Sequence, residues 1–176
     1  MDFSRFDYST LRAIYSECQA IKCPNLEIQF LEEFLKRDFT VFFITTNNPC
    51  SKIKNAFGKF ANHEKLVFLD CVSSKIGKIP KNPDSNIIFI SDSSLSEIQK
   101  EIDKIWQKTE GKKMLFFDCA ELLFMENQER EVFSFVHLTL QKLQRDGIVI
   151  FCFLKETSDK ITQTKLQHLF DETIFL

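Results

Sequence analysis

Polar side chains that could do chemistry gather where apolar, strand-like segments of the sequence end. These end points read Glu17-Cys18-Gln19, Thr46-Asn47-Asn48, Asp70-Cys71 and Asp118-Cys119-Ala120-Glu121. In sheets of parallel strands, ligand sites form at the carboxyl ends of the strands, so these residues are expected along one edge. A carboxylate such as Asp118 could hold a metal ion there. Lys22, which follows the first of these end points, could approach an anion.

Apolar, strand-like segments alternate with amphipathic, helix-like segments along the chain and would position these residues. Strands are predicted over residues 11–15, 39–45, 66–69, 86–90, 114–118, 148–154 and 173–176. Helices are predicted over residues 25–36, 51–61, 94–106, 129–145 and 165–169. Gly147 is predicted to close the helix 129–145. Continuous apolar strands separated by helices require crossover connections and a mostly parallel sheet. The predicted fold class is α/β, a three-layer sandwich, with residues 1–176 as one domain.

Charge and composition exclude several classes of protein. Hydrophobic residues make up 44% and charged residues 27% of the chain, which excludes wholesale disorder. The formal net charge is −2, and the densest basic run, residues 75–81, holds three lysines. We therefore do not expect the chain to bind nucleic acid strongly by itself.

The six cysteines contain no C-x-x-C pair, the N-terminus is polar, and no apolar run is as long as a membrane span. These features predict a cytoplasmic protein with reduced thiols and no membrane contact. Cys18 and Cys23 flank Lys22 and could form a redox switch, but nothing nearby favours a reactive thiolate. The histidines His63, His137 and His168 are scattered rather than clustered as in a zinc site.

The ordered series of segments resembles the RecA superfamily of P-loop ATPases, most closely its KaiC-like branch, over nearly the whole chain. LRAIYSE, the stretch up to Pro24 and the helix 25–36 resemble the strand, Walker A loop and helix of that family. Phe57-Gly58 resembles the pair that closes its next helix. MLFFD resembles the Walker B strand, with Asp118 in the aspartate position. The resemblance implies a RecA-like sheet and assembly with other subunits.

The residues that should hold the nucleotide phosphates depart from the family pattern. A P-loop, G-x-x-x-x-G-K-[ST], needs glycines for its backbone, a lysine for the phosphate charge and a hydroxyl for Mg²⁺. Here Glu17 replaces the first glycine, Lys22 the last glycine, Cys23 the lysine and Pro24 the Ser/Thr. The glutamate that normally follows the second strand is also missing, because that stretch reads Thr46-Asn47-Asn48.

These departures predict a non-catalytic RecA/KaiC-like domain, a pseudo-ATPase with no catalytic residues, no cofactor and no metal. Such a chain would act as a regulatory or scaffolding subunit through a protein partner, through an active RecA-like paralogue or by self-association. Phe3, Phe6 and Phe175 are candidates for the interface, since aromatic side chains are enriched in interface cores.

Two alternatives stay open. The chain could be an atypical nucleotide sensor or weak ATPase that uses Lys22 and Asp118. It could also be an accessory recombination protein that contacts DNA within an assembly. For Lys22 an exposed loop position is favoured over phosphate binding, and for Asp118 and Asp70 a strand-end or capping role is favoured over metal binding.

Overall fold

The computed structural model describes residues 12–18, 23–92, 94–154 and 160–175 of the chain. Aromatic and β-branched segments form strands β1 (Ala13–Cys18), β2 (Thr40–Thr45), β3 (Leu66–Asp70), β4 (Ile87–Phe89), β5 (Lys113–Asp118), β6 (Ile148–Leu154) and β7 (Glu172–Phe175). Within the described residues these seven strands form one sheet, in the order β4-β3-β2-β5-β6-β1-β7, and all neighbouring pairs are parallel. The predicted α/β class is confirmed.

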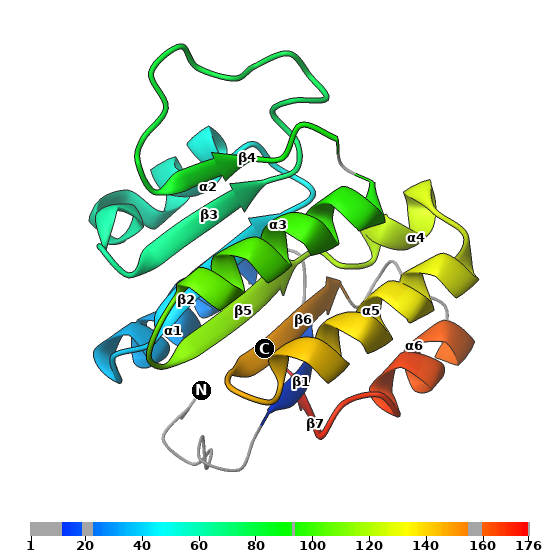
Figure 1. Cartoon of the computed structure of the whole chain (residues 1–176). Helices are drawn as coiled ribbons and strands as arrows, with labels where there is room; N and C mark the ends of the chain where they lie inside the picture. The colour runs from blue at the N-terminus through cyan, green and yellow to red at the C-terminus, as the bar shows by residue number, and fades with distance from the viewer. Residues whose placement is uncertain (1–11, 19–22, 93, 155–159, 176) are drawn as a thin grey trace.

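Helices cover both faces of this sheet. They are α1 (Cys23–Lys36), α2 (Cys50–Phe57), α3 (Leu95–Lys108), α4 (Leu122–Glu126), α5 (Glu129–Leu143) and α6 (Lys160–Gln167), and a 3-10 turn, η2 (Gly58–Asn62), follows α2. One core joins α1 and α2 to the sheet, through residues such as Phe30, Phe34 and Phe57. A second core joins α3, α4, α5 and α6 to the other face (Figure 1). The result is the three-layer sandwich that the alternation of segments predicts.

The largest departures from the predicted elements concern β1, α4 and α6. Strand β1 runs three residues beyond the predicted end at Tyr15, because it lies between β6 and β7 and pairs with both. Helix α4 was not predicted, because its five residues are too few to show a helical period. Helix α6 begins at Lys160 rather than at Lys165, since its polar sequence KITQTKLQ carries almost no apolar stripe.

Gly147 has a different role from the predicted one. Helix α5 ends before it, at Leu143, and Gly147 does not adopt the left-handed conformation of a helix-closing glycine. Instead, a Cβ atom at this position would lie 2.3 Å from Cζ2 of Trp106 and 2.8 Å from the carbonyl oxygen of Lys113. Glycine is therefore required because the Trp106 ring packs directly on the backbone. Trp106 is fixed there, because its Nε1 donates to Oδ1 of Asp146 at 2.8 Å.

Candidate functional site

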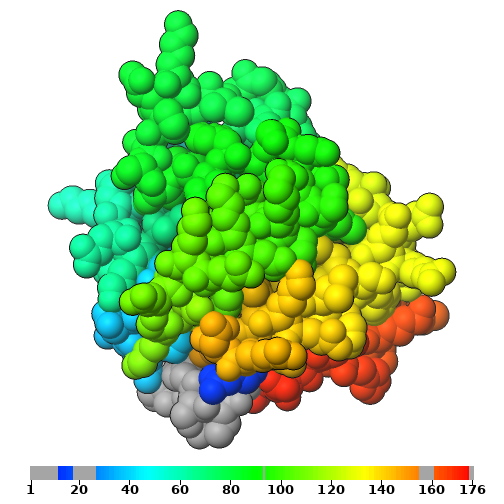
Figure 2. Space-filling view, viewed as in Figure 1, coloured from blue at the N-terminus to red at the C-terminus, as the bar shows by residue number. Residues whose placement is uncertain are grey.

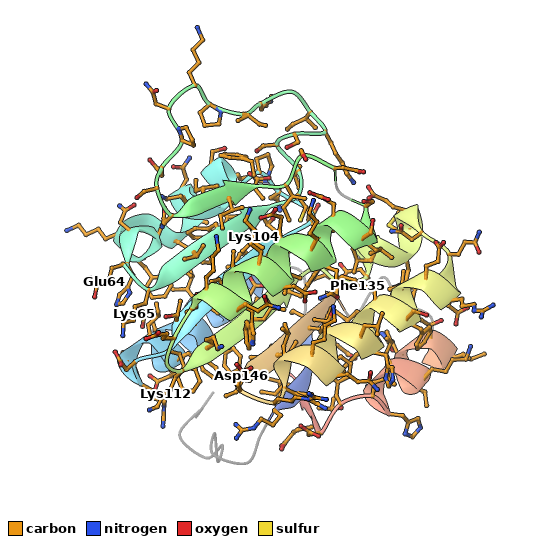
Figure 3. All side chains as sticks on the ribbon, in the orientation of Figure 1. Glu64, Lys65, Lys104, Lys112, Phe135 and Asp146 are labelled. Atoms are coloured by element: carbon orange, nitrogen blue, oxygen red, sulfur yellow. The ribbon has the colours of Figure 1, made fainter. Side chains whose placement is uncertain are left out.

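The candidate site lies at the carboxyl edge of the sheet, where Asp118 ends β5 and meets Glu27 of α1. Figure 3 labels Glu64, Lys65, Lys112 and Asp146, which lie at the opposite edge, where the strands begin. Asp118 is 4% exposed, and Glu27, near the beginning of α1, is 5% exposed. The two side chains are joined by a hydrogen bond. An acidic residue of the helix thus faces the acidic residue of the Walker B-like strand.

Burial and mutual repulsion keep this carboxyl pair from ionising fully. Burial, together with the charge of Asp118, raises the pKa of Glu27 well above its ordinary value. Burial also raises the pKa of Asp118, while the bonds from Glu27 and from the Cys119 thiol act in the opposite direction. Two adjacent carboxyl groups in a low-dielectric site hold one proton between them. Of the two, Glu27 is the group whose protonated form is favoured more strongly, and in that form it donates to Asp118.

A further carboxyl group lies beside the pair, and another ends a strand farther along the same edge. Glu121 is 5% exposed, and burial raises its pKa to about 7. One of its carboxyl oxygens accepts a hydrogen bond from the backbone N–H of Leu154 at 3.2 Å. Glu17, near the end of β1, is 7% exposed. This edge of the sheet therefore combines several buried acidic groups, an environment that disfavours phosphate.

The chain after β2 fixes the backbone next to Asp118. The Thr46 hydroxyl lies 2.9 Å from the carbonyl oxygen of Asp118 and 3.1 Å from that of Cys119. Cys119 has a φ of 52°, a left-handed conformation that is uncommon for a residue with a side chain. Asn47 extends its amide towards the Cys119 sulfur, at 3.8 Å. The residues at this strand end therefore bind neighbouring backbone and thiol groups, and their amides cannot act as a general base.

A cavity of about 250 Å³ opens beside the carboxyl pair. Glu27, Asp118 and Cys119 line one part of it, and Ile53 and Phe57 of α2 line another. Lys52 of α2 also borders the cavity, and its ammonium group donates to Oδ1 of Asn48 at 2.8 Å. The space combines an acidic wall with an apolar one.

Asp70, at the end of β3, has a structural role that its hydrogen bonds explain. Its carboxylate accepts from the backbone N–H groups of Cys50, Val72 and Ser73, each at 2.8 Å, and from the Ser73 hydroxyl at 2.7 Å. Asp70 thereby holds the beginning of α2 and the turn after β3. The predicted preference for a capping role is confirmed for this residue.

The structure brings only part of the predicted site together. Lys22 lies outside the described residues. Cys23 and Pro24 open α1, but their side chains are not described, nor is that of Cys18. The sequence interpretation missed Glu27, which occupies a buried position one turn before Phe30 on the apolar stripe of α1. A charged residue inside such a stripe is the signal that could have found it.

Other candidate chemistry is accounted for by burial or exposure. Cys50, Cys71, Cys119 and Cys152 are buried free thiols, and burial raises the pKa of each, to about 12 for Cys71. Such thiols react slowly. The three histidines are exposed, and His137 contacts Gln141. Among the described residues, no three His, Cys, Asp or Glu side chains are arranged to hold a metal ion. In the same part of the chain no helix has the length and hydropathy needed to cross a membrane.

Comparison with solved structures defines the fold. PH0321, an uncharacterized protein from Pyrococcus horikoshii crystallised with an unknown peptide, is 14% identical with a TM-score of 0.66, over 94% of this chain and 76% of that one. The KaiC-like protein PH0186 from the hyperthermophilic archaeon Pyrococcus horikoshii OT3 is 13% identical with a TM-score of 0.61, over 94% and 70%. A third solved structure, described as an ATPase domain, is 16% identical with a TM-score of 0.53, over 94% and 69%. The chain therefore has the fold of RecA/KaiC-like P-loop ATPase domains.

Within this fold, the chain belongs to a family described as "Family of unknown function (DUF7504)", whose sequence pattern matches residues 37–176. The match begins after α1 and so leaves Glu27 outside it. The comparison with curated proteins gave no match.

Proposed function

We propose that this chain is a non-catalytic RecA/KaiC-like domain that acts as a regulatory or scaffolding subunit through contacts with other proteins. The observation that carries the proposal is the buried pair of Glu27 and Asp118. In a working P-loop site the Walker B aspartate is ionised and helps to hold Mg²⁺. Here the same position is hydrogen-bonded to Glu27, a second acid whose pKa burial raises well above its ordinary value.

The surroundings of the pair also disfavour a nucleotide. A phosphate group binds where backbone N–H groups and basic side chains converge. The described part of the candidate site instead presents Glu121 beside the carboxyl pair. Asn47 and Asn48 stand where the family carries its general base. Each of these features removes a different requirement of ATP hydrolysis.

The second half of the proposal, action through protein contacts, is supported by analogy. PH0321, which shares the fold, was crystallised with an unknown peptide. RecA-like domains assemble side by side, and an inactive member of such an assembly can still position its neighbours. Of the candidate interface residues, Phe3 and Phe6 lie outside the described residues, as does the side chain of Phe175. Fold alone does not fix function, so this step needs its own experiment.

The direct test of the first half is calorimetric titration of the full chain with ATP and ADP, with and without Mg²⁺. We expect no binding at millimolar nucleotide. Micromolar binding would overturn the proposal and favour the alternative, a nucleotide sensor or weak ATPase. In that case turnover should disappear in Asp118→Ala and in Lys22→Ala, but not in Lys59→Ala, which removes an exposed lysine of η2.

The test of the second half is association. Sedimentation velocity over a wide range of protein concentration should show self-association, or stoichiometric association with a RecA-like paralogue from the same organism. A chain that stays monomeric throughout and does not bind the paralogue would contradict the scaffolding role.

A further inference from the structure

A second cavity lies on the other side of α2, beneath the long connection between β3 and β4. We call this connection, residues 71–86, the arch. It joins two parallel neighbours without a helix and stands out from the body of the molecule (Figures 1 and 2). Long connections without secondary structure are uncommon in compact domains and are often functional.

Both ends of the arch are fixed to the body. At its beginning, Ser73 donates to the carboxylate of Asp70 through its backbone N–H and its hydroxyl. At its end, the ammonium group of Lys54 donates to Oδ2 of Asp84 at 2.7 Å and to Oδ1 of Asn86 at 3.0 Å. The Asn86 amide in turn donates to the carbonyl oxygens of Ala61 and Leu66. Side-chain hydrogen bonds therefore hold both ends of the arch against the body of the molecule.

The cavity beneath the arch has a volume of about 500 Å³, which is within the range of small-molecule sites. On one side α2 and η2 present Ser51, Asn55 and Asn62 at helical spacing, and on the other side the arch presents Lys78 and Asn82. Hydroxyl and amide groups from two elements thus face the same space. The opposite face of α2, with Ile53 and Phe57, lines the cavity of the candidate site instead.

Of the described charged side chains that line this second cavity, Lys78 is the one that could bind an anionic ligand. The carboxylate of Asp70 is already occupied by four donors, and Asp84 is paired with Lys54. Among the described residues, no carboxylate forms an ion pair with Lys78. A ligand that suits this lining has one oxyanion group and several hydroxyl groups, because amides and hydroxyls bind hydroxyls while an ammonium group binds an oxyanion.

We propose that the cavity beneath the arch is a binding site for a small polyhydroxylated oxyanion, with Lys78 bound to the oxyanion and Asn55, Asn62 and Asn82 bound to the hydroxyl groups. The site is separate from the one described above and does not depend on how that one behaves. A phosphorylated sugar and a sugar acid share this chemistry, and the experiment distinguishes them.

The test is NMR titration of the ¹⁵N-labelled full chain with glucose 6-phosphate, gluconate and unmodified glucose. We expect glucose 6-phosphate or gluconate, but not glucose, to shift the amide signals of Ser51, Asn55, Asn62 and Asn82. Saturation by one of the two anions alone identifies whether the oxyanion is a phosphate or a carboxylate. Absence of localised shifts with both anions, or equal shifts with glucose, overturns the proposal.

Two matched pairs of variants locate the site. Lys78→Gln should weaken binding about tenfold, because a charge-assisted hydrogen bond is lost. Lys81→Gln removes a lysine of the same arch that does not line the cavity and should leave the affinity unchanged. Asn55→Trp should fill the cavity and abolish binding, whereas Gln29→Trp places the same side chain at an exposed position of α1. Equal affinities within either pair would contradict the assignment.

Discussion

Asp70 and Asp118 are two aspartates in equivalent positions with opposite surroundings. Both end strands of the same sheet, and both lie beside Thr45 of β2 in the strand register, one on each side. Both are buried, at 0% and 4% exposure. Asp70 accepts hydrogen bonds from four donors, whereas Asp118 faces the carboxyl group of Glu27. Residue type and strand position are therefore the same, and only the neighbours differ.

The difference separates an aspartate whose charge is compensated by donors from one that faces a second acid. A carboxylate that receives backbone N–H groups stabilises the fold directly, because its charge is compensated by those donors. A carboxylate opposite another acid has no such compensation, and the two carboxyl groups share one proton. Carboxyl groups with strongly perturbed pKa values cluster at functional sites, which is why Asp118 rather than Asp70 marks the candidate site.

The largest effect is expected for Asp70→Ala. This change leaves the buried backbone N–H of Cys50 and those of Val72 and Ser73 without their acceptor, and should lower the free energy of unfolding by about 4 kcal/mol. Urea unfolding followed by circular dichroism measures it. If Asp70→Ala does not fold, Asp70→Asn, which keeps one acceptor oxygen, should fold with a loss of about 2 kcal/mol. A loss below that of an exposed Asp92→Ala control would contradict the structural role of Asp70.

The next largest effect is a pH dependence of the free energy of unfolding that comes from Glu121, near Asp118. Burial raises the pKa of Glu121 from 4.5 to about 7, so in this range the native state holds a proton that the unfolded state has released. Stability from this group is therefore complete below pH 4.5 and is lost as the pH rises through 7, by up to about 3 kcal/mol. Glu121→Gln should remove this part of the dependence in urea unfolding from acidic to neutral pH.

The matched control for that experiment is Glu64→Gln, which changes an exposed glutamate. Its pH profile should follow that of the unmodified chain. If the pH profile of Glu121→Gln also matches that of the unmodified chain, burial does not raise the pKa of Glu121, and the environment assigned to this carboxyl group is wrong.

A smaller effect is expected at the backbone that carries Asp118. Thr46→Val removes the hydroxyl that bonds the carbonyl oxygens of Asp118 and Cys119, and should cost about 1 kcal/mol. Because Cys119 is held in a left-handed conformation there, its thiol should also become easier to alkylate. Thr46→Ser, which keeps the hydroxyl, should show neither change in unfolding or in mass-spectrometric labelling. A loss in Thr46→Ser without a loss in Thr46→Val would show that the methyl group, not the bond, matters.

The sequence predicts the sheet well, because its strands are continuous apolar runs whose ends are marked by polar residues. That pattern also finds Asp70 and Asp118, but it cannot tell them apart. The donors to Asp70 come from α2 and from the turn after β3. Glu27 meets Asp118 because of the way α1 packs on the sheet. Both depend on tertiary packing. Gly147 shows the same limit, since its need for glycine comes from Trp106, far away in the sequence.

The smallest effect is expected for Glu27→Gln, and it tests the shared proton most directly. An amide has nearly the shape of a protonated carboxyl group and can donate to Asp118 in its place. The free energy of unfolding at neutral pH should therefore stay within about 0.5 kcal/mol of the unmodified chain. At the structural aspartate, the corresponding amide variant, Asp70→Asn, loses several times more. A loss in Glu27→Gln as large as in Asp70→Asn would mean that Glu27 is ionised and bound to donors, and the two strand ends would then be alike.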